Sequence, residues 1–358
     1  MNSHCSTAKH RHPAVLQLKQ IAPKGVLLLT GLLLFLVSCR TGNLSRGERE
    51  KLSPKIFVIT GASSGLGRGI ALEAGRCRAT VVLASRNRSE LDKVASAIEA
   101  AGGRALVIPT DVSSEQQVER LADTVGKLFG RIDIWINNAG VAAVGRFWET
   151  PLADQRRVID VNLNGVLYGS FYAMKQFIRQ GSGVLINIAS VESNIPTAYQ
   201  AAYSASKAGV QNIGNTIRQE LRLNGYKKIR VVTVLPYALD TPLWDHAAVY
   251  TGHAPRMMAL DPPRKAVNVT LHACLRGKRS IAAGWKAKAA LAAHRIAPGL
   301  VERIGSNMTH KYQATQTPEK STGPGNLFHT LPTPGVEGGL KERMKKERKE
   351  RKEATKQP

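Results

Sequence analysis

Cysteine is scarce in this sequence, and its placement argues against two kinds of cysteine-dependent protein. The 358 residues contain four cysteines, Cys5, Cys39, Cys77 and Cys274, and none of them forms a CxxC pair. No histidines lie next to them at metal-ligand spacing, so the sequence predicts neither a zinc site nor a disulfide framework. We therefore expect no bound metal, and we interpret Cys77 and Cys274 as small buried apolar residues.

Acidic residues are also few: 26 of them face 51 lysines and arginines, which gives a formal net charge of +25. Such an excess often marks a nucleic-acid-binding protein, because clustered cations release counterions from phosphates. Here the positive charge is spread along the chain, and no zinc-finger spacing, RNP-like aromatic motif or helix-turn-helix pattern accompanies it. We expect no nucleic-acid partner, and we favour a solvated basic surface for which an anionic membrane is one fitting partner.

The chain lacks an apolar run of the length that a membrane-spanning helix needs. The stretch 26–37, with Gly25, has about 13 residues and would measure about 20 Å as a helix, against about 30 Å for the hydrocarbon core. Basic residues precede it and Ser38-Cys39 follows, as in a signal sequence with a lipidated cysteine. We expect residues 1–52 to attach the protein to a membrane, as a signal anchor or a lipoprotein-like segment. Export, or a cytoplasmic protein with an extension of little consequence, are the alternatives.

Short β-branched runs that alternate with helical stretches dominate the middle of the chain. These runs cover residues 56–60, 80–85, 105–110, 132–137, 184–190 and 229–235. Continuous apolar strands separated by helices predict an α/β fold, a Rossmann-type doubly wound parallel sheet with both faces covered. The length favours a single catalytic domain over 53–304, with the extension 1–52 before it and a basic tail, 305–358, after it. Its composition predicts that this tail is disordered or a solvated single helix.

The first of these strands leads directly into the glycine-rich segment TGASSGLG, residues 60–67. Glycines at 61, 65 and 67 let the backbone turn tightly and approach a pyrophosphate, whose charge the amide groups and the following helix N-terminus would meet. The strand before the turn and the helix after it favour this interpretation over an ordinary loop. The segment therefore predicts a dinucleotide-binding turn.

Three segments in order give the chain a resemblance to a known family. TGASSGLG, Asn137-Asn138-Ala139-Gly140 and the Tyr203–Lys207 YxxxK element resemble the classical short-chain dehydrogenase/reductase family over about residues 53–245. The resemblance implies that Asp111 binds adenine, that Thr241 contacts the nicotinamide amide, and that the protein forms a homo-oligomer. The implied cofactor-binding residues are Gly61, Ser63, Ser64, Gly65, Leu66, Gly67, Ser85, Arg86, Asp111, Val112, Asn138, Ala139, Gly140, Tyr203, Lys207 and Thr241.

The implied catalytic residues are Asn162, Ser190, Tyr203 and Lys207. Tyr203 and Lys207 are four residues apart on a predicted helix, so their side chains share a face. A free phenol titrates near pH 10, so proton transfer at neutral pH requires its phenolate to be stabilised by about 3 pKa units, or about 4 kcal/mol. The Lys207 ammonium and a positive nicotinamide ring could supply this. Ser190 would hold the substrate oxygen, and Asn162 matches the asparagine of the family's proton relay, with Asn164 as the neighbour most easily confused with it.

The end of the second predicted strand indicates which nicotinamide cofactor is used. A carboxylate there would accept hydrogen bonds from the adenosine ribose and repel a 2′-phosphate. This chain has Ser85 followed by Arg86, whose guanidinium can pair with the phosphate. We therefore predict that the cofactor is NADP(H).

Together these features predict an NADP(H)-dependent oxidoreductase that interconverts an alcohol and a ketone or aldehyde by hydride transfer, with Tyr203 as acid/base. A membrane-tethered NADP-binding sensor or scaffold without turnover is the alternative. The segment from Leu243 to Met258 is the expected substrate lid, with apolar candidates at Trp244, Tyr250, Met257 and Met258. These suit a small-molecule substrate that is lipid-like, although small polar carbonyls stay open.

Overall fold

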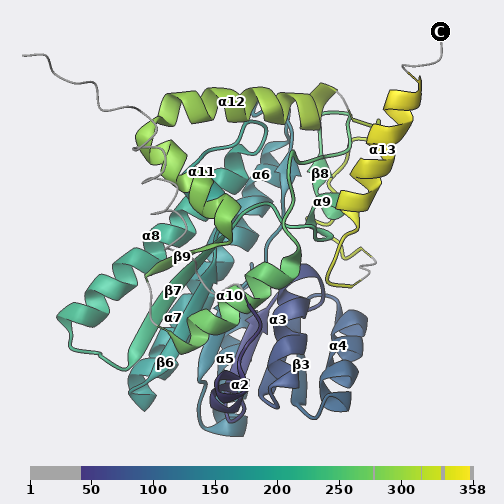
Figure 1. Ribbon diagram of the computed structural model, residues 1–358. Helices are drawn as coiled ribbons and strands as arrows, with labels where there is room; N and C mark the ends of the chain where they lie inside the picture. Colours follow the sequence, from purple (N-terminus) through teal and green to yellow (C-terminus); the bar gives the residue numbers. More distant parts are fainter. Residues whose placement is uncertain (1–41, 277–278, 316, 332–334, 355–358) are drawn as a thin grey trace, which may run out of the picture. The chain divides into compact units, whose positions relative to one another are not determined.

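Seven parallel strands form the central sheet in the order β3-β2-β1-β4-β6-β7-β9 (Figure 1). The computed structural model describes residues 42–276, 279–315, 317–331 and 335–354. The strands are β1 (Ile56–Thr60), β2 (Thr80–Ser85), β3 (Arg104–Pro109), β4 (Ile134–Asn137), β6 (Gly183–Ile188), β7 (Ile229–Pro236) and β9 (Ser280–Ala283). Val58 of β1 pairs with Val82 on one side and Trp135 on the other. The strand order reverses between β1 and β4, so the predicted Rossmann-type doubly wound sheet is confirmed.

Helices cover both faces of this sheet. One layer contains α3 (Gly65–Arg76), α4 (Arg88–Ala100) and α10 (Pro263–Leu275), and the other contains α5 (Glu115–Phe129), α7 (Gly165–Gln180) and α8 (Ala201–Leu223). Successive residues of a strand point to opposite faces. Phe57 and Ile59 accordingly pack with the first layer, whereas Val58 packs with the second. This burial on both faces explains why the strands are continuously apolar in sequence.

The helices begin and end where the local chemistry favours it. Asn87 and Ser114 precede α4 and α5, and their side chains accept the backbone N–H of Glu90 and Gln117. Gly130 follows α5 with φ 71°, a left-handed conformation that glycine adopts without a steric cost. Asn87 and Ser114 lie in strand-to-helix loops at the carboxyl edge of the parallel sheet, and Gly130 lies in a helix-to-strand loop at the opposite edge.

Further elements complete the edge at which the strands end. They are β5 (Ala143–Val144) paired with β8 (Ala248–Val249), α6 (Leu152–Ile159), the π-helix η1 (Asp160–Asn164), the 3₁₀-helix η2 (Val191–Ser193), α9 (Leu243–His246), α11 (Trp285–Ile296), α12 (Pro298–His310) and the π-helix η3 (Lys311–Thr315). Strand β9 was not expected from the sequence, because its four residues form too short a run to predict a strand. Cys77 and Cys274 are buried, as expected.

The predicted N-terminal boundary at residue 52 requires a correction. Helix α2 (Arg46–Leu52) belongs to the same domain, because Leu44 and Leu52 are buried in the core layer of α3 and α10. Glu48 of α2 also forms an ion pair with Arg276, which follows α10, at 2.6 Å. The apolar stretch 26–37 and Cys39 lie outside the described residues. Within the described residues, no helix is both long enough and apolar enough to cross a membrane.

The predicted C-terminal tail, 305–358, also requires a correction. Residue 305 lies within α12, and helix α13 (Leu340–Ala354) follows further along the chain. Leu340 is fully buried beside Trp244, and its backbone N–H donates to the Asp240 carboxylate at 2.8 Å. Arg256 pairs with Glu347 of α13 at 2.7 Å. The described part of the tail therefore packs on the domain, and buried anchors such as Leu340 cannot be recognised from its strongly polar composition.

Candidate active site

One cavity of about 420 Å³ lies at the carboxyl ends of the strands and contains most of the predicted site residues. It is lined by every predicted cofactor-binding residue except Gly67, and by Ser190, Tyr203 and Lys207 of the catalytic set. Asn162 lies behind its wall and is fully buried. Residues that the sequence places far apart therefore meet at one site, as the strand order requires.

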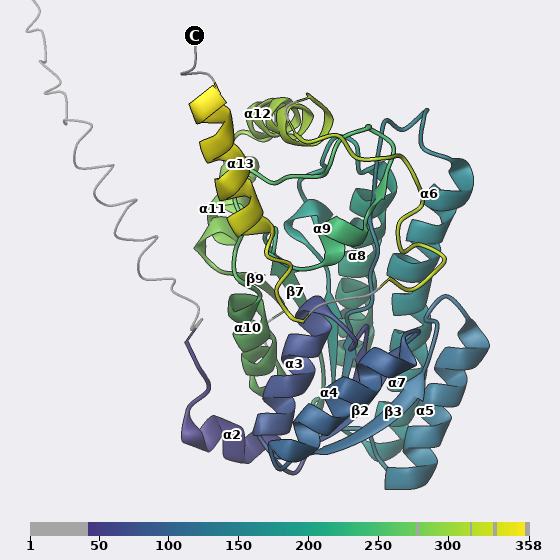
Figure 2. The same ribbon diagram turned by 90° about the vertical axis from the view of Figure 1, so that its right-hand side faces the viewer.

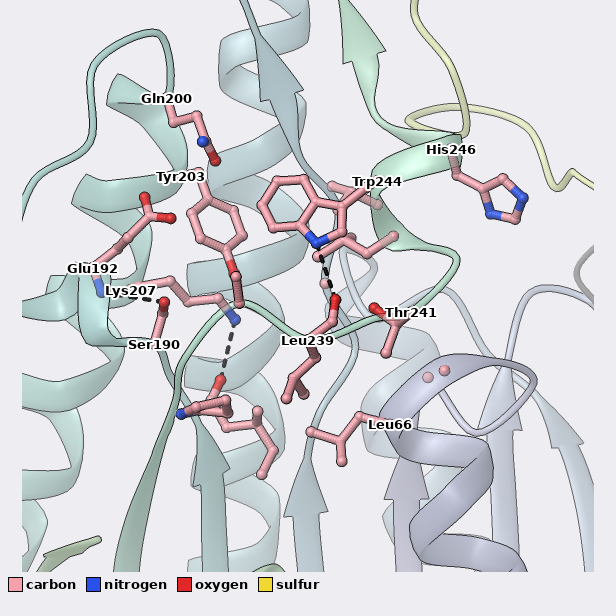
Figure 3. Close-up of a pocket in the computed structure, with 18 of the residues that line it drawn as sticks. Leu66, Ser190, Glu192, Gln200, Tyr203, Lys207, Leu239, Thr241, Trp244 and His246 are labelled. Atoms are coloured by element: carbon pink, nitrogen blue, oxygen red, sulfur yellow. Dashed lines mark hydrogen bonds between the residues drawn. The ribbon is translucent and has the colours of Figure 1, made fainter. Parts of the chain in front are cut away.

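Tyr203 and Lys207 extend from α8 toward Ser190, which stands at the end of β6 (Figure 3). The Lys207 Nζ lies 5.5 Å from the Tyr203 ring centroid and donates to the Ile188 carbonyl at 3.1 Å. Ser190 precedes η2, and its hydroxyl accepts the Glu192 N–H at 3.1 Å. The serine hydroxyl, the phenol and the ammonium thus converge on one corner of the cavity.

Burial dominates the protonation behaviour of this corner. It raises the pKa of Tyr203 above its usual value, the nearby Glu192 raises it further, and a hydrogen bond from Ser190 lowers it. Burial also lowers the pKa of Lys207 to about 8, while Glu192 opposes that change. The direction for Tyr203 is opposite to the lowering that proton transfer at neutral pH requires. The Lys207 ammonium and a positively charged nicotinamide would therefore have to supply the missing phenolate stabilisation.

Asn162 lies in the π-helix η1, and its side chain is fully engaged. It accepts the Val141 N–H at 2.8 Å and donates to the Val141 carbonyl at 2.9 Å and to the Ser206 hydroxyl at 3.3 Å. Asn164, by contrast, donates to Asp160 of its own helical turn. The structure therefore links Asn162 to the cofactor side of the site and leaves Asn164 in a local contact. π-Helical turns of this kind occur often at functional sites.

The glycine-rich turn has no space for a side chain at Gly61 or Gly67. A Cβ on Gly67 would lie 2.2 Å from the Gly61 carbonyl oxygen, and a Cβ on Gly61 would lie 2.8 Å from the Ala139 Cα. Gly61 and Gly65 also have positive φ, at 66° and 53°. The backbone thus forms a concave surface at the N-terminus of α3, and this shape fits a dinucleotide pyrophosphate. Asn138 supports the turn from behind by donating to the Thr60 carbonyl at 2.9 Å.

Asp111 contacts an arginine that sequence reasoning missed. Its carboxylate accepts from Arg157 of α6 at 2.7 Å and from the Ser113 hydroxyl at 2.7 Å. Although burial raises the pKa of Asp111, these hydrogen bonds lower it overall. Nothing in the spacing of residues 111 and 157 indicates this pair, because only the packing of α6 brings them together.

Arg86 lines the cavity as predicted, but both ends of its guanidinium already have partners. Nη1 donates to the Leu327 carbonyl at 2.9 Å, and Nη2 donates to the Asn326 carbonyl at 2.7 Å. Burial lowers the pKa of Arg86, which Asp111 partly offsets. The C-terminal segment that supplies these carbonyls was not expected at the site, since its sequence carries no recognisable motif.

Glu192 is a further titratable residue that the sequence did not single out. It lines the cavity, and its carboxylate accepts the Ser204 hydroxyl at 2.9 Å. Burial raises the pKa of Glu192 to about 7, although Ser204, Thr197 and Lys207 act in the opposite direction. Figure 3 shows its carboxylate beside Tyr203.

Three of the four apolar residues expected in the substrate lid lie at the apolar end of the cavity. Trp244, Met257 and Met258 line it, and the Trp244 indole N–H donates to the Leu239 carbonyl at 3.1 Å (Figure 3). Tyr250 does not line the cavity, because its hydroxyl bonds Asp154 instead. Helix α12 contributes Val301 and Met308 as well, which sequence reasoning did not assign to the site.

Comparisons with known proteins agree with this geometry. A family model described as short chain dehydrogenase matches residues 55–248. The Bacillus subtilis protein named uncharacterized oxidoreductase YxnA is 32% identical over 273 residues, which cover 75% of this chain and 76% of that one. The Eggerthella lenta 3beta-hydroxysteroid dehydrogenase 1 is 39% identical over 196 residues, 54% of this chain and 74% of that one. A Burkholderia phymatum short chain dehydrogenase/reductase structure in complex with NAD has 25% identity and a TM-score of 0.62, over 75% of this chain and 99% of that one. The family model spans more than half of this chain, and the protein therefore belongs to the short-chain dehydrogenase family of oxidoreductases.

Proposed function

We propose that the protein interconverts an alcohol and a ketone or aldehyde, uses NADP(H), and prefers an apolar, lipid-like substrate. The observation that carries this proposal is the single cavity in which the glycine-rich turn faces Ser190, Tyr203 and Lys207. A sensor or scaffold would need the turn but would not need a serine hydroxyl, a phenol and an ammonium group directed at one corner. The site therefore favours turnover over binding alone.

In the reducing direction, the Ser190 hydroxyl orients the substrate carbonyl oxygen and Tyr203 donates a proton to it. The bound nicotinamide cofactor would supply the hydride to the carbonyl carbon. The Lys207 ammonium, held by the Ile188 carbonyl, stabilises the phenolate that remains on Tyr203. In the oxidising direction, Tyr203 accepts the alcohol proton.

Two features support the choice of cofactor. Ser85 places no carboxylate at the end of β2, and Arg86 follows it in the same cavity. A guanidinium pairs strongly with a phosphate, so Arg86 favours a cofactor with a 2′-phosphate. The Burkholderia relative in complex with NAD does not favour this choice, so the proposal depends on Ser85 and Arg86 alone.

The apolar end of the cavity supports the proposed substrate class. Trp244, Met257, Val301 and Met308 offer mainly carbon and sulfur surface there. Such a wall fits a bulky apolar molecule better than a small polar carbonyl. The name of the Eggerthella lenta relative, a 3beta-hydroxysteroid dehydrogenase, is in line with this class.

A cofactor oxidation screen tests the proposal. NADPH consumption would be followed with ketones and aldehydes of increasing size, and NADP⁺ reduction with the matching alcohols. We expect turnover that increases with the apolar size of the substrate. Tight NADPH binding without turnover of any alcohol, ketone or aldehyde would instead favour the sensor or scaffold alternative.

A further inference from the structure

The C-terminal residues 317–331, here called the C-terminal strap, lie along the segment 246–254 of the domain. Val249 and Gly323 exchange backbone hydrogen bonds at 3.0 Å, and the Asn326 N–H donates to the His246 carbonyl at 2.9 Å. Leu327 is fully buried in the core layer that contains α5 and α7. Figure 2 shows this part of the chain passing α6 before it turns back toward α13. The strap is therefore anchored by one apolar side chain and a row of backbone contacts.

The strap lines the part of the cavity that contains the Arg86 side chain. Asn326, Thr330 and Leu331 line the same cavity as Gly61 and Ser85. The Leu327 carbonyl accepts from Arg86 and also from Arg157 Nε, each at 2.9 Å. Two cationic side chains that face the adenosine end of the site are thus both bound to one peptide oxygen.

These bonds engage both terminal nitrogens of Arg86. A guanidinium carries five N–H groups, and one N–H of each terminal nitrogen donates to the strap, so a phosphate that pairs with both of these nitrogens competes with the strap carbonyls for them. A peptide carbonyl is neutral, whereas a phosphate is charged and accepts stronger hydrogen bonds. A 2′-phosphate could therefore displace Asn326 and Leu327, but it would have to overcome the contacts that anchor the strap.

We propose that the C-terminal strap sets the cofactor preference, because its Asn326 and Leu327 carbonyls compete with the 2′-phosphate of NADP(H) for Arg86. This inference rests on the proposed function, in which Arg86 binds that phosphate. NADP(H) binding and release of the strap from Arg86 are then coupled, and the coupling is reciprocal. The apparent affinity for NADP(H) is reduced by the fraction of molecules in which the strap is closed.

A second contact affects both nicotinamide cofactors equally. The Gly65 N–H, in the glycine-rich turn, donates to the Gly335 carbonyl at 3.2 Å. Any dinucleotide whose pyrophosphate uses that amide must displace Gly335, whether or not it carries a 2′-phosphate. The ratio of the NADH and NADPH dissociation constants therefore isolates the competition at Arg86.

The first test weakens the anchor of the strap in the full chain. Leu327→Ala removes buried side-chain contacts, while His329→Ala changes an exposed residue two positions away and serves as the control. NADPH and NADH dissociation constants would be measured by titration of the reduced-cofactor fluorescence, without turnover. We expect Leu327→Ala to tighten NADPH binding by about threefold to tenfold and NADH binding by less than about twofold. An unchanged ratio of the two constants would overturn the proposal.

The second test uses the wild-type protein, so it does not depend on how well a variant folds. Lys320 lies in the strap, and its backbone N–H donates to the Gly252 carbonyl at 2.9 Å. Saturating NADPH should accelerate tryptic cleavage after Lys320, and NADH at equal occupancy should accelerate it less. Equal cleavage rates with both cofactors, or protection by NADPH, would contradict the competition.

A double-mutant cycle separates this inference from the proposed function. Arg86→Ala is combined with Leu327→Ala, and the same two dissociation constants are measured. We expect the effect of Leu327→Ala on their ratio to vanish when Arg86 is absent. If Arg86→Ala leaves the ratio unchanged even in the Leu327→Ala background, Arg86 does not bind the phosphate and the proposed cofactor choice fails. If Arg86→Ala changes the ratio and Leu327→Ala does not, only the role of the strap fails.

Discussion

Asn162 and Val141 are joined by two hydrogen bonds, because the asparagine side chain accepts the valine N–H at 2.8 Å and donates to the valine carbonyl at 2.9 Å. Both residues are buried. Val141 directly follows the Asn138-Ala139-Gly140 segment, so this pair fixes the π-helix η1 against the loop expected to contact the cofactor. A side-chain amide is well suited to this position, because it offers a donor and an acceptor to one backbone residue.

Asn162→Ala should therefore destabilise the fold as well as the site. The substitution leaves the buried N–H and carbonyl of Val141 without partners, and each loss costs about 1–3 kcal/mol. We expect the free energy of unfolding to fall by about 2–6 kcal/mol, as measured by urea denaturation. Asn164→Ala is the matched control, since the Asn164 amide donates to Asp160 of its own turn, and this variant should cost well under half as much. If both variants lost the same free energy of unfolding, the hydrogen bonds between Asn162 and Val141 would not contribute more to stability than the local contact of Asn164.

Tyr203→Phe should remove the transferable proton and keep the ring. We expect turnover to fall at least about a hundredfold, equivalent to about 2.7 kcal/mol in the barrier, with cofactor affinity little changed. Steady-state kinetics and a cofactor titration would measure the two quantities separately. Activity close to that of the wild type would eliminate Tyr203 as the acid/base.

Lys207→Ala should reduce turnover and cofactor affinity together, because we propose that the ammonium stabilises the Tyr203 phenolate and the family resemblance implies that it contacts the cofactor ribose. Burial holds the Lys207 pKa near 8, so the ammonium is lost as the pH rises through that value. Cofactor binding to the wild type should weaken over this interval, and binding to the variant should not show the same dependence. A titration between pH 6.5 and 9.5 would check this. A loss confined to turnover would argue against the contact with the ribose.

Glu192→Gln should change how stability depends on pH. Burial raises the Glu192 pKa from 4.5 to about 7, so between these values the folded state holds a proton that the unfolded state releases. The contribution of Glu192 to the free energy of unfolding is fully present below pH 4.5 and is lost as the pH rises through about 7. Glutamine stays neutral, so the free energy of unfolding of the variant should exceed that of the wild type by an amount that grows from pH 4.5 to about pH 7 and reaches about 3 kcal/mol.

Thermal or urea unfolding across that pH range would measure the gain. The exposed Glu99→Gln variant, on α4, is the control and should show no such trend. If the free energies of unfolding of Glu192→Gln and the wild type differed by the same amount at every pH, the assigned protonation change would be contradicted.

Membrane attachment through the N-terminal extension stays a prediction from the sequence. We expect the full-length protein to fractionate with membranes at both low and high salt. Labelling with a radioactive fatty acid should be lost in Cys39→Ala if this cysteine is lipidated. Full-length protein that remains in the soluble fraction at low salt would contradict attachment of either kind.

The doubly wound sheet and most of the site were accessible from the sequence because their signals are local. Strands such as Ile56–Thr60 are apolar on both faces, and the glycine-rich turn follows one of them directly. Tyr203 and Lys207 share a helix face because they are four residues apart. The absence of a carboxylate at Ser85 is equally local. Each of these features depends on neighbouring residues and on backbone periodicity, and both can be read from a single sequence.

Only the tertiary structure determined which distant groups meet, and therefore which charges are satisfied. Arg86 and Leu327 are 241 residues apart, and Arg157 and Asp111 are 46 apart. No periodic pattern connects the members of either pair. The burial that raises the Glu192 pKa likewise depends on the packing of α8 and α11 against η2. The sequence by itself predicted the fold and the glycine-rich turn from local spacing, and its resemblance to a family predicted the catalytic side chains that the cavity brings together. Whether Arg86 is available to a cofactor depends on where a polar C-terminal segment packs, and its contacts across the whole chain decide that.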